Sequence, residues 1–112
     1  MREGDIVLTS LPQADGQIKN RPALLLRVLP PFNDALLCGI STQLSRAVTG
    51  FYEIINLQDT DFASSGLVTA SVIRLGFLAV VPQSQLIGSI GQISFECRKR
   101  LLKNLSDHLV KV

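Results

Sequence analysis

The sequence contains few of the residues that bind metals or form disulfides. Its two cysteines, Cys38 and Cys97, lie far apart, and its one histidine is His108. A structural zinc site takes about four clustered Cys, His or carboxylate ligands, and a disulfide framework needs several paired cysteines. We therefore expect no metal, no disulfide framework and no cofactor.

The common catalytic and nucleotide-binding motifs are also absent. The chain has no G-x-G-x-x-G pattern, no P-loop and no G-x-S-x-G pattern. A Ser-His-Asp arrangement would have to use His108, which lies in a polar stretch near the C-terminus. A lone histidine in such a place is more often a solvated side chain, so we assign it no catalytic role.

Long hydrophobic runs are missing as well. The longest apolar run covers residues 75–81, which is short of the roughly 18 residues that a membrane-spanning helix needs. The N-terminus shows no signal-peptide pattern, and we expect a cytoplasmic protein with no membrane partner. The formal net charge of +2 neither proves nor excludes a nucleic-acid partner.

The apolar content is sufficient for one buried core. The 112 residues are 46% hydrophobic and 18% charged, which predicts a single domain over residues 1–112. Arg74 is the only charged residue from position 62 to position 95. Because interface cores are depleted in charge, we expect this stretch to face a second copy in a homodimer. The alternative is a neutral surface of Ser, Gln and Gly.

Hydrophobic patterning predicts a mainly β protein with a helix at its C-terminus. Strands are expected at residues 4–9, 22–29, 35–41, 50–55, 67–73 and 77–81, polar loops at 11–20 and 58–66, and a short helix at 82–87. Ser94 has the residue type of an N-cap, and Leu101, Leu105 and Leu109 recur every four residues, which indicates an amphipathic helix. The set predicts a small, strongly curved sheet or barrel capped by that helix.

Two polar groups are expected to meet at one end of this sheet. Arg21 stands at the start of an apolar strand, with its backbone restricted by Pro22. Ser41 stands at the end of the next strand, and the two strands flank a turn at Pro30-Pro31. Antiparallel pairing through that turn puts the start of the first strand beside the end of the second. Arg21 and Ser41 are therefore predicted at the same end of the sheet.

Five segments, taken in order along the chain, carry a family resemblance: Gly4-Asp5-Ile6-Val7, Asn20-Arg21-Pro22-Ala23, Ile40-Ser41-Thr42-Gln43, Ser71-Val72-Ile73-Arg74 and a helix at Gln85-Leu86-Ile87-Gly88. Together they resemble the MazF/PemK (also Kid) toxins of type II toxin–antitoxin systems. No single segment is specific, but the ordered set is. The resemblance implies an SH3-like barrel with a short helix and a C-terminal helix, acting as a homodimer.

The resemblance also implies an activity. Such toxins are mRNA interferases, which are sequence-specific endoribonucleases that cut single-stranded RNA without a metal, and a cognate antitoxin protein neutralises them. The ribose 2′-OH attacks its own 3′ phosphate and leaves a 2′,3′-cyclic phosphate and a 5′-OH. The family's arginine before proline matches Arg21, and its threonine at the end of the third strand matches Ser41, which keeps the hydroxyl. The residues expected to bind the substrate are Gln17, Lys19, Thr42, Gln43 and Arg74.

Some features depart from the family pattern. Gly16 precedes Gln17, with Asp15 one position earlier, where some members carry an acid before the glutamine. Ala70-Ser71 stands where some members carry an Asp-Gln pair, so a carboxylate is missing there. Aromatic residues are only 5% of the chain, and Phe32 and the Phe51-Tyr52 pair are the best candidates for stacking on bases.

A second hypothesis keeps the fold and drops the nuclease. The chain would then act by binding a protein, as a CcdB-like gyrase poison or as a degenerate regulator. The residues allow simpler roles too. Arg21 could pair with Asp15 or Asp5 on the surface, and Ser41 could only satisfy a backbone group at the strand end. Arg74 could belong to an interface ion pair.

Overall fold

The computed structural model describes residues 1–12 and 16–112, which form one six-stranded antiparallel sheet and two α-helices. The order of strands across the sheet is β4-β5-β3-β2-β1-β6. The elements in chain order are β1 (Asp5–Pro12), β2 (Ile18–Leu29), β3 (Asp34–Ser41), the 3₁₀ turn η1 (Leu44–Arg46), β4 (Glu53–Ile55), α1 (Thr60–Ser65), β5 (Ser71–Val81), the 3₁₀ turn η2 (Gln83–Gln85), β6 (Leu86–Gln92) and α2 (Phe95–Leu109).

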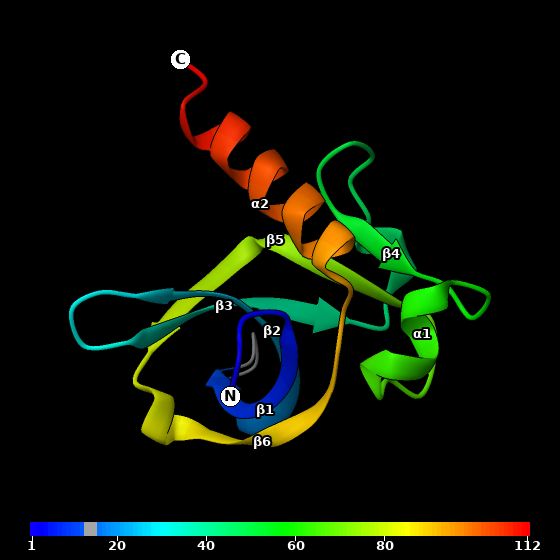
Figure 1. Ribbon diagram of the computed structural model, residues 1–112. Helices are drawn as coiled ribbons and strands as arrows, with labels where there is room; N and C mark the ends of the chain where they lie inside the picture. The colour runs from blue at the N-terminus through cyan, green and yellow to red at the C-terminus, as the bar shows by residue number, and fades with distance from the viewer. Residues whose placement is uncertain (13–15) are drawn as a thin grey trace.

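The sheet is strongly curved, as the sequence predicted. In Figure 1 β5 crosses above the middle strands while β6 passes below them, and α2 lies on the β5 side of the curled sheet. The small curved sheet with a short helix and a C-terminal helix confirms the expected fold class. Within the described residues, no helix is long and apolar enough to cross a membrane.

Alternating side chains of the central strands separate two apolar clusters. Leu24 and Leu26 of β2 face the larger cluster, which also contains buried residues of α2. Ala23 and Leu25, the intervening residues, face a smaller cluster with Leu37 of β3. Because successive residues of a strand point to opposite faces, the sheet has one face covered by α2 and one face turned away from it.

Helix α2 starts where the sequence predicted. The Ser94 hydroxyl accepts a hydrogen bond from the Cys97 backbone N–H at 3.1 Å, which is the contact that an N-cap serine makes. Leu101 and Leu105 are buried in the larger cluster. Leu109 completes the predicted spacing but is exposed, because the last turn of the helix extends beyond the sheet (Figure 1).

Several of the expected elements differ in the structure. The polar loop expected at 11–20 includes the end of β1 (Asp5–Pro12) and the start of β2 (Ile18–Leu29). Residues 58–66, predicted as a polar loop, contain α1, which ends at Gly66 in a left-handed conformation. The helix predicted at 82–87, including Gln85–Gly88, is only η2 followed by strand β6. The strands predicted at 67–73 and 77–81 are one strand, β5. Strand β4 is also shorter than the predicted 50–55. Long-range pairing explains such differences. The Gly-rich sequence of β6, for example, is a weak strand former on its own, but it forms a strand by pairing with β1.

Candidate active site

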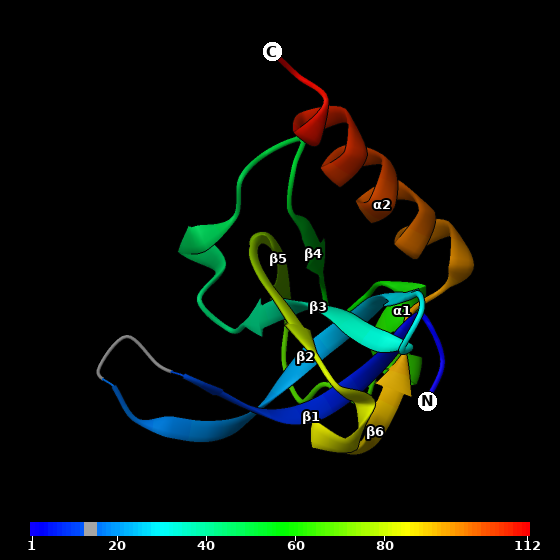
Figure 2. The ribbon, with the colours of Figure 1, turned by 90° about the vertical axis from the view of Figure 1, so that its left-hand side faces the viewer.

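Arg21 lies on β2, near the base of a long β1–β2 hairpin. It pairs with Thr9 of β1, and its side chain is exposed. One residue further out, the Ser10 hydroxyl donates a hydrogen bond to the Asn20 side-chain oxygen at 2.9 Å, which ties the two strands together. Figure 2 shows β1 and β2 extending together beyond the rest of the sheet.

Strands β2 and β3 bring Arg21 and Ser41 to the same end of the sheet. Their antiparallel ladder runs from Leu29 opposite Asp34 to Ala23 opposite Gly39. Arg21 stands two residues beyond the last pair on β2, and Ser41 stands two residues beyond it on β3. The antiparallel arrangement expected from the sequence is therefore present, with the Pro30-Pro31 turn at the opposite end.

The same alternation places both residues on one face. Ala23 and Gly39 point to the face of the smaller cluster, because Leu25 and Leu37 on the same strands belong to it. Two residues further along each strand, Arg21 and Ser41 return to that face. This is the face turned away from α2, so the helix does not cover it.

The hydroxyl of Ser41 accepts one hydrogen bond in the structure and donates none to the described residues. Its oxygen accepts from the Gln43 backbone N–H at 3.1 Å, as the simpler strand-end interpretation of Ser41 requires. Among the described residues no group accepts the proton of the hydroxyl, so that proton remains available to a substrate oxygen. Thr42 and Gln43 are both exposed beside it.

Arg74 approaches this region from β5. It pairs with Gly39 of β3, and its guanidinium carbon lies 5.6 Å from the centre of the Phe77 ring. The Arg74 Nε is buried and has no hydrogen-bond partner among the described residues. Arg74 forms no salt bridge within the described residues, and an ion pair with a second copy stays a prediction.

The remaining predicted binding residues lie on the hairpin. Lys19 is within β2, opposite Leu11, and Gln17 directly precedes the strand. Both side chains are exposed. Asp15, one of the two acids considered as a partner of Arg21, lies outside the described residues, as does the middle of the predicted 11–20 loop. Asp5, the other acid considered for Arg21, accepts a hydrogen bond from the Arg2 backbone N–H instead.

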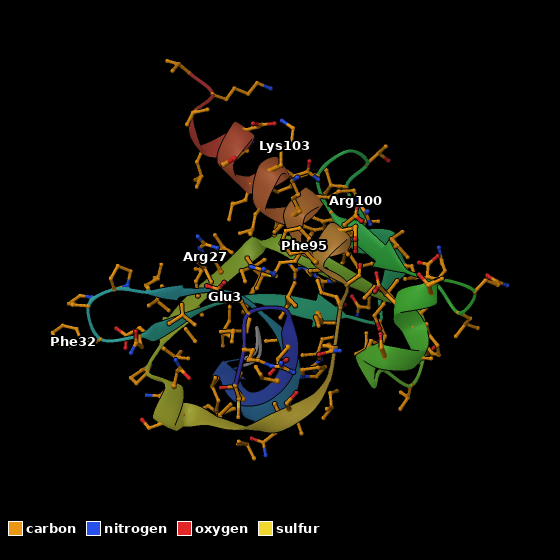
Figure 3. The ribbon with its side chains drawn as sticks, in the orientation of Figure 1. Glu3, Arg27, Phe32, Phe95, Arg100 and Lys103 are labelled. Atoms are coloured by element: carbon orange, nitrogen blue, oxygen red, sulfur yellow. The ribbon has the colours of Figure 1, made fainter. Side chains whose placement is uncertain are left out.

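The basic residues fall into two groups, those that form salt bridges and those that do not. Four basic residues pair with carboxylates in the described chain: Arg27 and Arg98 with Glu3, Arg100 with Glu53, and Lys103 with Asp107. Figure 3 shows several of these residues along and near α2. Lys19, Arg21, Arg46 and Arg74 have no carboxylate within 4.0 Å among the described residues. Arg2, Lys99 and Lys111 are unpaired too, at the N-terminus and on or after α2. The site end thus keeps positive charge that no described carboxylate neutralises.

Arg46 is a residue that sequence reasoning missed. It ends η1, shortly after Ser41, and its Nε donates to the Gln43 side-chain oxygen at 2.6 Å. This contact leaves the Gln43 amide nitrogen as an outward donor. The available signal was a basic residue a few positions after the strand end, which is too common on surfaces to single out.

The titratable groups of the usual catalytic types lie elsewhere. The His108 ring is 5.1 Å from that of Phe51, on the helix that packs against the opposite face. Burial raises the pKa of Cys97 to about 12 and also raises the pKa of Cys38, so neither thiol is a nucleophile near neutral pH. In the part of the chain that the structure describes, no three His, Cys, Asp or Glu residues are grouped as metal ligands.

Comparison with known proteins gives a consistent family assignment. The protein-family model for the PemK-like, MazF-like toxin of type II toxin–antitoxin systems matches residues 2–109. Among solved structures, the chain is similar to the Mycobacterium tuberculosis toxin MazF-mt6, with a TM-score of 0.65 and 22% sequence identity over 94% of this chain and 95% of that one. At that identity the likeness shows the fold. No curated protein sequence matches the chain.

Proposed function

Because the chain belongs to the PemK-like, MazF-like toxin family of type II toxin–antitoxin systems, we propose that it is the toxin of such a pair and acts as a sequence-specific endoribonuclease on single-stranded RNA. The observation that carries the proposal is the placement of Arg21 and Ser41 at the same end of the sheet and on the face opposite α2. Unneutralised cations surround that end, as a site for a polyanion requires.

The proposed reaction is an internal transesterification. The 2′ oxygen of one ribose forms a bond to the adjacent phosphorus, and the bond from phosphorus to the 5′ oxygen of the next nucleotide breaks. The products are a 2′,3′-cyclic phosphate and a 5′-OH. The proton of the 2′-OH leaves and the 5′ oxygen gains one, so the net reaction needs no metal and no other cofactor.

Arg21 and Ser41 stabilise the charge that develops on the phosphorane. The Arg21 guanidinium has a planar fork of donors that matches two phosphate oxygens. The free hydroxyl proton of Ser41 supplies a third donor. Pre-positioned donors of this kind are often the largest single contribution to such catalysis. An arginine guanidinium is a poor general base, so we assign Arg21 to charge stabilisation and assign no residue as the base.

The substrate strand is held by the groups around this pair. Lys19 and Arg74 attract phosphates, while Gln17, Thr42 and Gln43 provide hydrogen bonds to sugars and base edges. An acidic segment of the cognate antitoxin would compete for the same positive surface and so block RNA. We place both partners on the Arg21 face.

The test is cleavage of a long single-stranded RNA by the purified protein in the presence of EDTA, with mapping of the new ends. We expect discrete cuts that carry 5′-OH ends. Arg21→Ala should lower the cleavage rate by about 100-fold or more, which is the cost of removing one preorganised donor. The matched control is Arg27→Ala, which removes an exposed arginine from the same strand, where it pairs with Glu3.

The outcomes separate the two hypotheses. Equal loss in Arg21→Ala and Arg27→Ala would remove Arg21 from the chemistry. No cleavage by a well-folded wild type at high enzyme concentration would reject the nuclease and favour action by binding to a protein such as gyrase.

A further inference from the structure

We propose that Phe77, backed by Arg74, is the platform on which a base of the bound RNA stacks. The inference rests on the proposed RNA substrate and extends it to a residue with no assigned role. Recognition of single-stranded RNA depends on unstacked bases that lie against aromatic rings or guanidinium planes. A site at Arg21 and Ser41 therefore needs such a surface within reach.

The positions of the six aromatic residues leave Phe77 as the one on the site face. Phe51, Tyr52 and Phe62 pack against the larger cluster under α2. Phe95 is in the first turn of α2, with its ring 5.5 Å from the Arg98 guanidinium carbon.

Phe32, one of the stacking candidates from the sequence, is 81% exposed but lies at the tip of the β2–β3 turn, at the far end of the strands from Arg21 (Figure 3). Phe77 alone packs against the smaller cluster, on the face that carries Arg21 and Ser41.

A bulge in β5 and a glycine in β3 position the Phe77 ring beside the site. The ladder between β3 and β5 jumps from Cys38 opposite Leu78 to Gly39 opposite Arg74, so three residues of β5 form a bulge that contains Phe77. The ring lies over Gly39, where an added Cβ would come within 2.9 Å of Phe77 Cδ1. Gly39 is two residues before Ser41 on the same face, which sets the ring next to the catalytic pair.

Arg74 completes the platform. Its guanidinium carbon lies 5.6 Å from the centre of the Phe77 ring, within the range of a cation–π contact. Its Nε is buried without a hydrogen-bond partner. Its two terminal nitrogens also have no acceptor among the described residues and can therefore donate to a phosphate. Together they can bind one nucleotide, since the ring stacks on the base and the guanidinium binds the phosphate.

The experiment uses the absence of tryptophan from the chain. Phe77→Trp introduces a single fluorophore at the platform, and Phe32→Trp introduces one at the far turn as the matched control. Each is titrated with a mixed-sequence 2′-O-methyl oligoribonucleotide, which has no free 2′-OH and is not cleaved. We expect the fluorescence of Phe77→Trp to be quenched on binding and that of Phe32→Trp to be unchanged. A ribose-phosphate oligomer without bases should quench neither.

A second pair of variants tests the platform if the larger ring disturbs packing over Gly39. Phe77→Leu keeps an apolar side chain there and removes the ring, and Phe77→Tyr keeps the ring. Affinity for the oligonucleotide should fall about tenfold in Phe77→Leu, in line with the loss of one base stack, and change less than twofold in Phe77→Tyr. Thermal unfolding confirms that each variant is folded.

The outcomes distinguish this inference from the nuclease proposal. Wild-type affinity in Phe77→Leu, or binding to Phe77→Trp without quenching, would overturn the platform even if the enzyme cleaves RNA. Quenching and weakened binding by an enzyme that does not cleave would support the platform and reject the nuclease. A wild type that binds no oligonucleotide would reject both.

Discussion

At the scale of the residue, the hydroxyl of Ser41 binds the backbone and still has a proton to donate. Its oxygen accepts from the Gln43 backbone N–H, which fixes the chain as it leaves β3 and turns toward η1. That bond occupies a lone pair and leaves the proton free. The backbone contact and the proposed donor role are therefore compatible.

Ser41→Ala removes both roles, while Ser41→Thr keeps the hydroxyl. If the hydroxyl donates to the phosphorane, kcat of Ser41→Ala should fall about 100-fold, as for other single donors, and Ser41→Thr should stay within a few fold of wild type. The measurement is single-turnover cleavage of a short oligoribonucleotide. Ser45→Ala, an exposed serine of η1, is the control. Equal rates for Ser41→Ala and Ser45→Ala would show that the hydroxyl does not participate.

Which site residues the sequence could predict depends on how local their signals are. Arg21 before Pro22 and Ser41 at a strand end are local patterns, and a single turn between their strands was enough to predict that they lie at the same end of the sheet. Arg74 was named as a substrate-binding residue with the family resemblance, whereas Phe77 was not, because its approach depends on the bulge between β3 and β5. The pairing register between two strands that are more than thirty residues apart cannot be predicted from the sequence of either strand alone.

At the scale of the element, α1 illustrates a helix that its own sequence does not specify. Its six residues, TDFASS, are too few to show a helical period and include weak helix formers. Contacts made elsewhere hold it in place. Gly66 ends it in a left-handed conformation, and an added Cβ at Gly66 or Gly91 would collide with backbone of the facing segment. The close approach of α1 and β6 therefore requires both glycines.

Asp61 makes α1 part of the support of α2. One of its carboxylate oxygens accepts from the Ser94 backbone N–H at 2.8 Å, and the other accepts from the Ser94 hydroxyl at 3.1 Å. Ser94 in turn caps α2 through the Cys97 N–H. The carboxylate also lies at the positive end of the helix dipole, where negative charge is favourable.

Asp61→Ala should therefore destabilise the fold even though α1 is short and near the surface. We expect the free energy of unfolding to fall by about 1–2 kcal/mol, the usual cost of losing a helix cap and its charge. Urea denaturation followed by circular dichroism measures it. Asp107→Ala, which removes an acid paired with Lys103 on the outer side of α2, should leave the unfolding midpoint almost unchanged. Similar midpoints for the two variants would contradict the support role of Asp61.

At the scale of the whole molecule, composition and period predicted the architecture better than the individual elements. The count of apolar stretches and the four-residue spacing of leucines gave a curved sheet with one C-terminal helix, and both are present. The errors at α1 and β6 lie where pairing or capping across the chain outweighs local preference. Such contacts exist only in the folded molecule, so propensity and period do not contain them.

The outer half of β5 has the character of a surface that pairs with a second copy. Strand β4 covers β5 only from Ser71 to Ile73, so the edge of β5 beyond Arg74 is unpaired among the described residues. Leu78 is 42% exposed and Val80 is 55% exposed on this half. The segment also lies in the stretch with a single charge. Open edges and apolar, charge-poor surface are typical of subunit interfaces, and we propose that the homodimer forms here.

Leu78→Lys tests that assembly. A lysine in an apolar contact loses its hydration without gaining a partner, and the C2 symmetry expected of a homodimer brings the two introduced charges into the same interface. We therefore expect wild type to sediment as a dimer and Leu78→Lys as a folded monomer at the same concentration, measured by analytical ultracentrifugation. Leu57→Lys places the same charge at an exposed leucine outside the charge-poor stretch and should remain dimeric. A monomeric wild type would exclude the dimer, whereas a dimeric Leu78→Lys would move the interface away from β5. Because Arg21 and Ser41 come from neighbouring strands of one chain, the monomeric variant should retain both proposed catalytic groups. Its residual cleavage rate would then measure how much of the RNA-binding surface depends on the second copy.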